Sequence, residues 1–346
     1  MIQQAVKRDI GLDLVRAMAI VMVVIIHTAS GAATAGVGSA NWYGALSWAA
    51  LARPAVPLFF MCSGALMLGR DIPLKRLYGH NMLRVIVAML VWAFVYQLDG
   101  LTPGQLTPAN LWYAVKSTLV LNHVFHFYYL HILILVYAFV PIVRVFIRGA
   151  SRREVEYLLV IWLAVGILTP LLQSFWPFTL VSPMRQWYKM NMSYAAIGYG
   201  VLGWYLKQYG NTIAGKWYWL AFTGGLALTF GGTAILSLRA GWLVESFLEG
   251  MSPGPMLMAF GLFGLMANRE SWPGWLEKAG GRLALSSFCI YLIHILVLVH
   301  AREMGLDPAA SPSLVIIPLS VLAVMIPSYL CWEVLRHIPI VKTWLI

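Results

Sequence analysis

Long apolar runs separated by short polar segments follow one another along the chain. Each run approaches the roughly 20 residues that an α-helix needs to cross a hydrocarbon core. The pattern predicts ten transmembrane helices, near residues 12–29, 52–69, 82–98, 127–147, 156–174, 191–206, 217–237, 252–267, 283–300 and 313–335. The stretch from Leu111 to Phe125 is apolar but shorter, and its Lys116, Asn122 and His123 favour a re-entrant or interfacial helix.

The composition excludes a soluble protein of this length. Apolar residues make up 60% of the 346 residues and charged residues only 11%, whereas an average soluble chain is roughly 25% charged. We therefore expect an all-α integral membrane protein, surrounded by membrane lipid, with residues 1–346 forming one domain. The net charge of +11 then bears on orientation in the bilayer, and nucleic acid is not an expected partner.

The distribution of Lys and Arg predicts that both termini are cytoplasmic, because cytoplasmic loops carry an excess of these residues. With the N-terminus inside, the outer segments hold five of the 24 cations, namely Lys116, Arg185, Lys189, Arg239 and Arg302. The inner segments hold sixteen: Lys7, Arg8, Arg70, Lys75, Arg76, Arg144, Arg148, Arg152, Arg153, Lys207, Lys216, Arg269, Lys278, Arg282, Arg336 and Lys342. Three more, Arg16, Arg53 and Arg84, lie within spans.

An alternative for the N-terminus is a cleaved signal peptide, which would leave nine spans. Lys7 and Arg8, the apolar run from Ala17 to Ile26 and the small residues 33–35 imitate such a signal. Arg16 interrupts this segment, and ten spans agree better with the charge distribution.

The first predicted span carries three ionisable residues, Asp13, Arg16 and His27. Ionisable groups inside spans are costly and usually mark a site. Arg16 and His27 are eleven residues apart, which places them on nearly one helical face, separated by roughly 16 Å along the axis. The face therefore offers a cation for an anionic ligand and a base farther along. An equally acceptable interpretation is an interfacial Asp–Arg pair and a histidine that reaches outward to water.

Further polar candidates lie in the second and third spans. Arg53 precedes the string from Val56 to Gly64, in which Pro57 would loosen the helix and Ser63 with Gly64 would allow close helix packing. Arg84 lies deeper in an apolar run than Lys75 and Arg76, which makes it a candidate ligand for an anion.

Histidines also accompany the fourth and ninth spans. His123, His126 and His131 are spaced by three and five residues, so they do not share one helical face, and no carboxylate or cysteine completes a metal-ligand set. We therefore expect no metal site. His126 at the mouth of the bundle and His294, surrounded by apolar residues, are the candidates for function.

Together these motifs resemble the membrane acyltransferase 3 family of bacterial O-acyltransferases, in order, from about Gly11 to Arg302. The family's first-span signature is an Arg, ten residues and a His, which Arg16 and His27 match, with Asp13 also in place. Other matching segments are Val56–Gly64 preceded by Arg53, His126–Leu130 followed by Tyr137 and Pro141, Ile197–Leu206, and Ser287–Leu298, which contains His294. The sequence departs from the family at the third span, where Asn81 stands three residues before Arg84 in place of the first of two arginines.

The resemblance implies an O-acetyltransferase of the bacterial cytoplasmic (inner) membrane that uses acetyl-CoA or another acyl-CoA as donor and no further cofactor. The implied acceptor is a sugar hydroxyl of a lipid-linked or exported glycan. His27 would be the general base, because histidine has a pKa near 6.5 and suits this role at neutral pH. Arg16 would position the donor and Asp13 would orient Arg16. Arg84, Arg53, Ser63, His126 and His294 would contact the substrates.

Two other function classes compete with this interpretation. A proton-coupled transporter of a small anion or glycan precursor would also use buried His and Arg, but no internal repeat supports it. A non-enzymatic partner of a polysaccharide synthase would need no buried His–Arg face. The sequence also lacks a GxSxG serine-nucleophile motif, which favours direct transfer over an acyl-enzyme.

Overall fold

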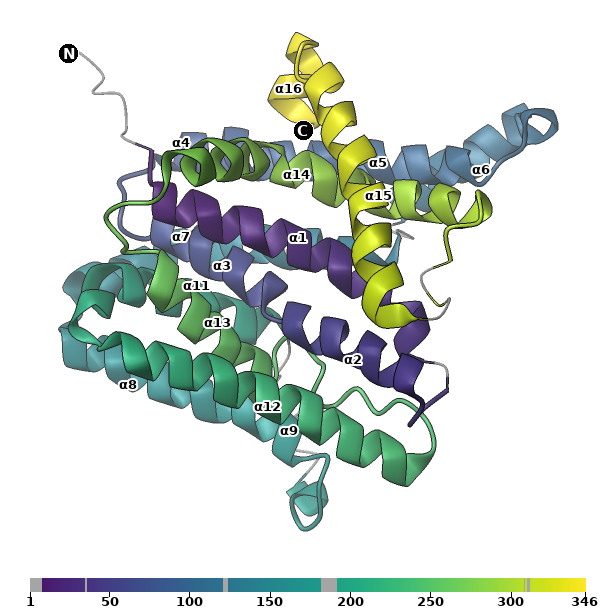
Figure 1. Cartoon of the computed structure of the whole chain (residues 1–346). Helices are drawn as coiled ribbons and strands as arrows, with labels where there is room; N and C mark the ends of the chain where they lie inside the picture. Colours follow the sequence, from purple (N-terminus) through teal and green to yellow (C-terminus); the bar gives the residue numbers. More distant parts are fainter. Residues whose placement is uncertain (1–7, 35, 121–123, 182–191, 308, 310–311) are drawn as a thin grey trace.

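The computed structural model describes residues 8–34, 36–120, 124–181, 192–307, 309 and 312–346. Within these residues the protein is helical and contains no β-strand, as expected for an all-α membrane protein. The helices form a layered bundle, with α1 inside it and α6 extending outward from it (Figure 1). Of the sequence positions discussed above, Lys7, Ala35, Asn122, His123, Arg185 and Lys189 lie outside the described residues.

The α-helices are α1 (Ile10–Ala33), α2 (Ala40–Ala52), α3 (Ala55–Met67), α4 (Leu74–Arg76), α5 (Leu83–Asp99), α6 (Pro108–Leu119), α7 (Tyr128–Gly149), α8 (Arg152–Trp162), α9 (Thr169–Leu172), α11 (Met192–Tyr209), α12 (Gly215–Ala240), α13 (Pro253–Met266), α14 (Gly274–Glu303), α15 (Ser313–Leu335) and α16 (Pro339–Trp344). Single π-helical turns, Leu77–Met82 and Leu163–Leu168, join α4 to α5 and α8 to α9. Short 3₁₀ turns are Pro103–Gln105, Phe125–Phe127, Phe178–Val181 and Gly210–Thr212.

Eight helical segments among the described residues are long and apolar enough to cross a membrane. They confirm a multispanning membrane protein and correspond to eight of the ten predicted spans. Of the other two, residues 191–206 fall largely in α11, which is not among the eight, and residues 252–267 form the shorter helix α13 of 14 residues. The total of ten spans and the cytoplasmic termini stay predictions.

The second span differs from its prediction. Residues 52–69 were expected, but the helical segment runs from Ala40 to Met67 and is interrupted at Arg53 and Pro54. Proline lacks a backbone N–H and its ring clashes with the preceding turn, which breaks the helix. Pro57, expected to loosen the helix, lies in the first turn of α3, where a missing N–H costs little.

The expected short helix is present as α6, which begins earlier than Leu111 and ends at Leu119. Its 12 residues cover roughly 18 Å, too little to cross a bilayer. Thr107 caps it by accepting a hydrogen bond from the backbone N–H of Asn110. Phe125, the predicted end of this stretch, belongs instead to the 3₁₀ turn that precedes α7.

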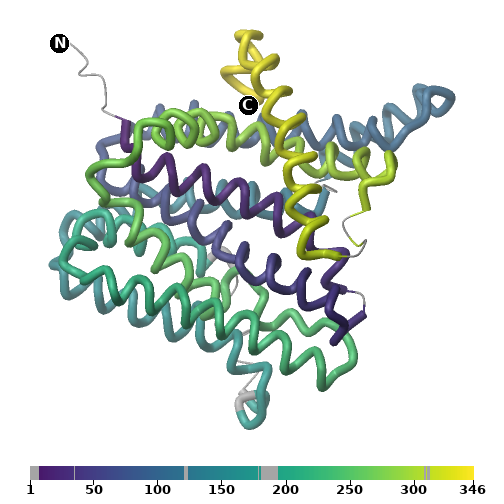
Figure 2. The backbone as a smooth tube through the Cα atoms, in the orientation of Figure 1, coloured from purple at the N-terminus to yellow at the C-terminus, as the bar shows by residue number. Residues whose placement is uncertain are grey.

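The core is built around α1, which packs against α2, α3, α13, α14 and α15 (Figure 2). Glycines permit the closest approaches, as the sequence predicted for Ser63 and Gly64. A Cβ placed on Gly64 would lie 1.9 Å from the carbonyl oxygen of Gly200, so α3 and α11 meet backbone to backbone there. The packing of α1 against its five neighbouring helices holds it in place and thereby positions His27.

Candidate active site

Three histidines that are distant in sequence meet at one end of the bundle. His27 lies near the end of α1, His126 in the 3₁₀ turn before α7, and His294 in α14. The ring centroids are 5.1 Å apart for His27 and His294, 5.2 Å for His126 and His294, and 6.2 Å for His27 and His126. The sequence singled out each residue, and the structure brings them together.

His294 is held in one tautomer by its own helix. Its Nδ1 lies 2.7 Å from the carbonyl oxygen of Tyr291 and 3.1 Å from that of Ile290. Because a carbonyl oxygen can only accept, Nδ1 carries the hydrogen. The ring is fully buried, and its Nε2, an acceptor in this tautomer, has no partner among the described residues.

His126 is buried in an aromatic cage without hydrogen bonds to its ring. The side chain is 1% exposed, and neither Nδ1 nor Nε2 has a partner in the described part of the chain. The rings of Tyr96, Phe127 and Tyr291 surround it, and the Tyr291 hydroxyl donates to its backbone carbonyl. Buried polar groups are normally bonded, so both nitrogens are available to a ligand.

His27 faces a small cavity. The cavity measures about 60 Å³ and is lined by Val23, Ile26, His27, Arg53, Val56, His126, Tyr128, Tyr129, Gly250 and Tyr291. Its size suits a few water-sized groups. The His27 ring makes no hydrogen bond to any described residue and contacts the rings of Phe125, His126 and His294.

Arg53 supplies a cation to the same cavity. It lies at the break between α2 and α3, with Nη2 3.9 Å from Glu245 and with no described partner for Nε. The interruption of the second span therefore has a local consequence, because it places a guanidinium beside His27. The sequence identified Arg53 as a candidate substrate-binding residue but did not predict the break between α2 and α3.

Arg16 and Asp13 lie farther toward the start of α1 and do not line the cavity. Arg16 Nη2 donates to the Ser287 hydroxyl at 3.3 Å, and its Nη1 is 3.8 Å from Asp13. Asp13 also pairs with Arg8, through the Nε of that side chain. The predicted Asp13–Arg16 pair thus exists, but Asp13 is shared with a second arginine that sequence reasoning did not single out.

Arg84, the expected anion ligand, is covered by α16 and the residues after it. Its Nη2 donates to the main-chain oxygen of Ile346, and its guanidinium lies 5.4 Å from the centre of the Phe288 ring. Trp92 Nε1 holds the same segment by donating to Leu345 at 3.0 Å. An anion that binds Arg84 must displace or adjoin this contact.

Ser63 is not brought to the cavity. Its hydroxyl donates to the carbonyl oxygen of Phe59 at 2.9 Å, within α3. Mid-helix serines commonly make this bond to the preceding turn. The residue therefore contributes to the packing of α3 where α11 approaches, and the structure does not place it with the three histidines.

Sequence reasoning missed the tyrosines of the site. Tyr291 precedes His294 by three residues, so both lie on one helical face, and this spacing was a usable signal. Tyr129 lines the cavity, and Tyr96 contacts His126 from α5. Tyr96 resembled any aromatic residue of an apolar run, and only the packing of α5 against α14 reveals its place.

Comparison with known proteins identifies the family of the chain. The family model described as an acyltransferase domain, that of acyltransferase 3, matches residues 9–333. No curated protein and no solved structure matches the chain. The matched region includes all three histidines, Arg16 and Arg53. The chain is therefore a membrane acyltransferase that belongs to the acyltransferase 3 family.

Proposed function

We propose that the protein transfers an acyl group, acetyl in the first instance, from cytoplasmic acyl-CoA to a sugar hydroxyl of a lipid-linked or exported cell-surface glycan. The observation that carries this proposal is the meeting of His27, His126 and His294 beside a cavity that also holds Arg53. Acyl-CoA is consumed as a substrate, and no resident cofactor takes part in the proposed reaction.

In the proposed reaction, His27 removes the hydroxyl proton as the sugar oxygen attacks the carbonyl carbon of the thioester. The carbonyl electron pair moves to its oxygen and gives a tetrahedral oxyanion. Collapse of this intermediate breaks the C–S bond. The leaving sulfur takes the proton from His27, and CoA departs as the free thiol. A positioned general base typically contributes about 10²–10⁴ in rate.

The surroundings of His27 support its role as base. Its ring lies at the cavity and makes no hydrogen bond to the described residues, so a substrate hydroxyl meets no competing partner. His294 presents an unpaired Nε2 acceptor in the neighbouring ring. A hydrogen bond from the His27 N–H to this acceptor would leave the other His27 nitrogen free to take the proton, so we assign His294 as a positioning residue.

We assign to Arg53 the stabilisation of the tetrahedral oxyanion. It lines the cavity with His27, and its Nε has no partner among the described residues. Preorganised donors at the developing oxyanion are often the largest single contribution to acyl transfer. The Arg53 side chain is only 18% exposed, which reduces the screening of its charge.

The donor would bind through two cations that do not line the cavity, Arg16 on α1 and Arg84 on α5. Phosphates favour Arg and Lys, and Arg16 and Arg84 are the cations that we assign to them. Three helical turns separate Arg16 from His27, roughly 16 Å along α1. A CoA whose phosphates bind Arg84 and Arg16 would extend its acyl arm along this face toward His27.

The acceptor would reach His27 from the opposite side of the bacterial inner membrane. The sequence motifs also resemble those of the O-acetyltransferase that modifies enterobacterial common antigen, and a surface glycan of that kind is the proposed acceptor. The orientation rests on the Lys and Arg distribution of the sequence.

Release of CoA thiol by the purified protein in lipid nanodiscs tests the proposal. With acetyl-CoA and a glycolipid extract of the source envelope, the wild type should release CoA and label the extract from [¹⁴C]acetyl-CoA. His27→Ala should lower both rates at least a hundredfold, while His337→Ala, at an exposed histidine outside the spans, should not change them. CoA release that persists in His27→Ala would refute the assigned base, and a wild type that releases no CoA would favour a transporter.

A further inference from the structure

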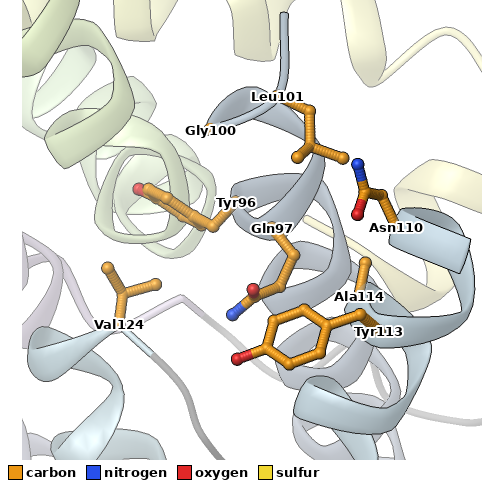
Figure 3. Close-up of a pocket in the computed structure, with 8 residues that line it drawn as sticks. All are labelled: Tyr96, Gln97, Gly100, Leu101, Asn110, Tyr113, Ala114 and Val124. Atoms are coloured by element: carbon orange, nitrogen blue, oxygen red, sulfur yellow. The ribbon is translucent and has the colours of Figure 1, made fainter. Parts of the chain in front are cut away.

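A second, larger cavity lies beside the histidine cluster. It measures about 380 Å³ and is lined by Tyr96, Gln97, Gly100, Leu101, Asn110, Tyr113, Ala114 and Val124. The end of α5 forms one wall and α6 the other, and the side chains of Tyr96, Gln97 and Tyr113 border a common space with Val124 across from them (Figure 3). We call it the α5–α6 cleft. Its volume falls within the roughly 300–1,000 Å³ typical of small-molecule sites.

The lining of the α5–α6 cleft fits a neutral polyhydroxylated ligand. Two tyrosine rings provide flat apolar surface with a polar edge. Gln97 and Asn110 provide amides that both donate and accept hydrogen bonds, as sugar hydroxyls do. Among the described residues that line the cleft there is no Lys, Arg, Asp or Glu, and these residues therefore offer no cation to the phosphates of CoA.

The cleft adjoins the histidines through Tyr96. The Tyr96 ring is 5.6 Å from the His126 ring, centre to centre, and His126 is 6.2 Å from His27. The Tyr96 hydroxyl donates to the carbonyl of Leu292 at 2.9 Å and accepts from the N–H of Leu296 at 3.2 Å. Tyr96 therefore joins the cleft to the turn of α14 that carries His294.

We propose that the α5–α6 cleft binds a saccharide unit of the acceptor and directs its reacting hydroxyl past Val124 toward His126 and His27. This inference rests on the proposed acyltransferase function and assigns its acceptor subsite. Tyr113 stacks on the sugar ring, and Oδ1 of Asn110, whose Nδ2 donates to the carbonyl oxygen of Gln105 at 2.8 Å, accepts a hydrogen bond from a sugar hydroxyl. His126, with both ring nitrogens unpaired among the described residues, receives the reacting end.

Two adjacent aromatic residues of α6 provide a matched test. Tyr113 lines the cleft and is 63% exposed, whereas Trp112 is 67% exposed and does not line it. Both are aromatic and exposed to a similar extent, so a general effect of losing an exposed aromatic side chain would follow either substitution. Only Tyr113→Ala removes a surface of the cleft.

The experiment measures steady-state transfer from [¹⁴C]acetyl-CoA in nanodiscs, with envelope glycolipid extract titrated by its hexose content as acceptor. Tyr113→Ala should raise the apparent KM for acceptor roughly five- to tenfold, the effect of losing about one neutral contact, with a smaller change in the KM for acetyl-CoA. Tyr113→Phe should retain most of the affinity, and Trp112→Ala should match the wild type. Asn110→Leu, measured in parallel, should also raise the acceptor KM.

The failures are distinguishable. If the wild type transfers label but Tyr113→Ala and Asn110→Leu keep the acceptor KM of Trp112→Ala, the acceptor subsite lies elsewhere and the acyltransferase proposal stands. If the KM for acetyl-CoA rises as much as that for acceptor, the cleft serves the donor or the fold, and the inference is wrong. A wild type that transfers no label overturns the proposed function and the subsite together.

Discussion

The imidazole rings of His27 and His294 lie 5.1 Å apart, centre to centre, and are inclined by 37°. The backbone carbonyls of Ile290 and Tyr291 fix the tautomer of His294, so its unpaired Nε2 is an acceptor. A helix turn thus holds one histidine so that it can orient another. In serine hydrolases a carboxylate orients the catalytic histidine, and in the proposed mechanism His294 orients His27.

Loss of the acceptor on His294 should reduce catalysis more than substrate binding. His294→Phe should lower kcat roughly tenfold or more with a smaller change in the KM for acetyl-CoA, because a base without its orienting partner is misplaced only for the chemical step. His294→Gln should restore part of kcat, since its amide oxygen can accept the same hydrogen bond. Equal activities of the Phe and Gln variants would assign His294 to packing alone.

Removal of the Arg53 guanidinium should lower kcat by about 10²–10³, the usual effect of losing one oxyanion donor. The variant is Arg53→Gln, which keeps a polar side chain at the helix break. Arg148→Gln is the control, because Arg148 pairs with the exposed Asp71 and does not line the cavity. A KM increase with unchanged kcat would assign Arg53 to substrate binding instead of the intermediate.

The contact of α3 with α11 should tolerate no side chain at Gly64. A Cβ there would lie 1.9 Å from the Gly200 carbonyl oxygen, and overpacking of this kind costs about 1–3 kcal/mol or more. Gly64→Ala should therefore lower the unfolding temperature in nanodiscs. Gly224→Ala, on α12 with nothing within 4 Å of the new Cβ, should leave it unchanged or raise it. Equal unfolding temperatures would show that the two helices separate easily.

Much of the membrane fold was predictable, because lipid requires nearly continuous apolar runs and helices that satisfy their own backbone. The limits of prediction appear at particular residues. Pro54 divides the second span, and the segment that extends it back to Ala40 forms α2, which packs against α1, α12 and α15. Short helices such as α13 carry weaker length signals than α1.

The histidines of the candidate site were predictable one by one but not as an arrangement, and its tyrosines were not predicted. His27, His126 and His294 were identified individually, yet their meeting depends on how α1, α14 and the 3₁₀ turn before α7 come together. Arg8 competes for Asp13, and the segment around Ile346 covers Arg84. These contacts join parts of the chain that no local pattern connects.

Arg84 should affect donor affinity more than turnover. Arg84→Ala should raise the KM for acetyl-CoA with a cost of roughly 1.5–3 kcal/mol, the value of one charge-assisted contact, because remote phosphate contacts act equally on the ground and transition states. Trp92→Phe removes the other hydrogen bond to the segment after α16 without removing the cation. If Trp92→Phe raises the KM equally, the docked segment and not the charge controls donor binding.

The last prediction concerns the side from which each substrate arrives. Arg16 lies three turns before His27 on α1 and donates to Ser287 on α14, so the cation proposed to hold the donor and the proposed base lie at different depths of the bundle. Acyl-CoA cannot cross lipid unaided, because its phosphates would have to leave water. In sealed right-side-out vesicles, internal acetyl-CoA with external glycan should give product, whereas external acetyl-CoA should give little until detergent opens the vesicles.

Arg16→Lys should weaken the reaction of internal donor roughly tenfold, because an ammonium does not reproduce the planar guanidinium between Asp13 and Ser287. Equal product from donor on either face of sealed vesicles would place the whole reaction at one aqueous surface and would overturn transfer along α1.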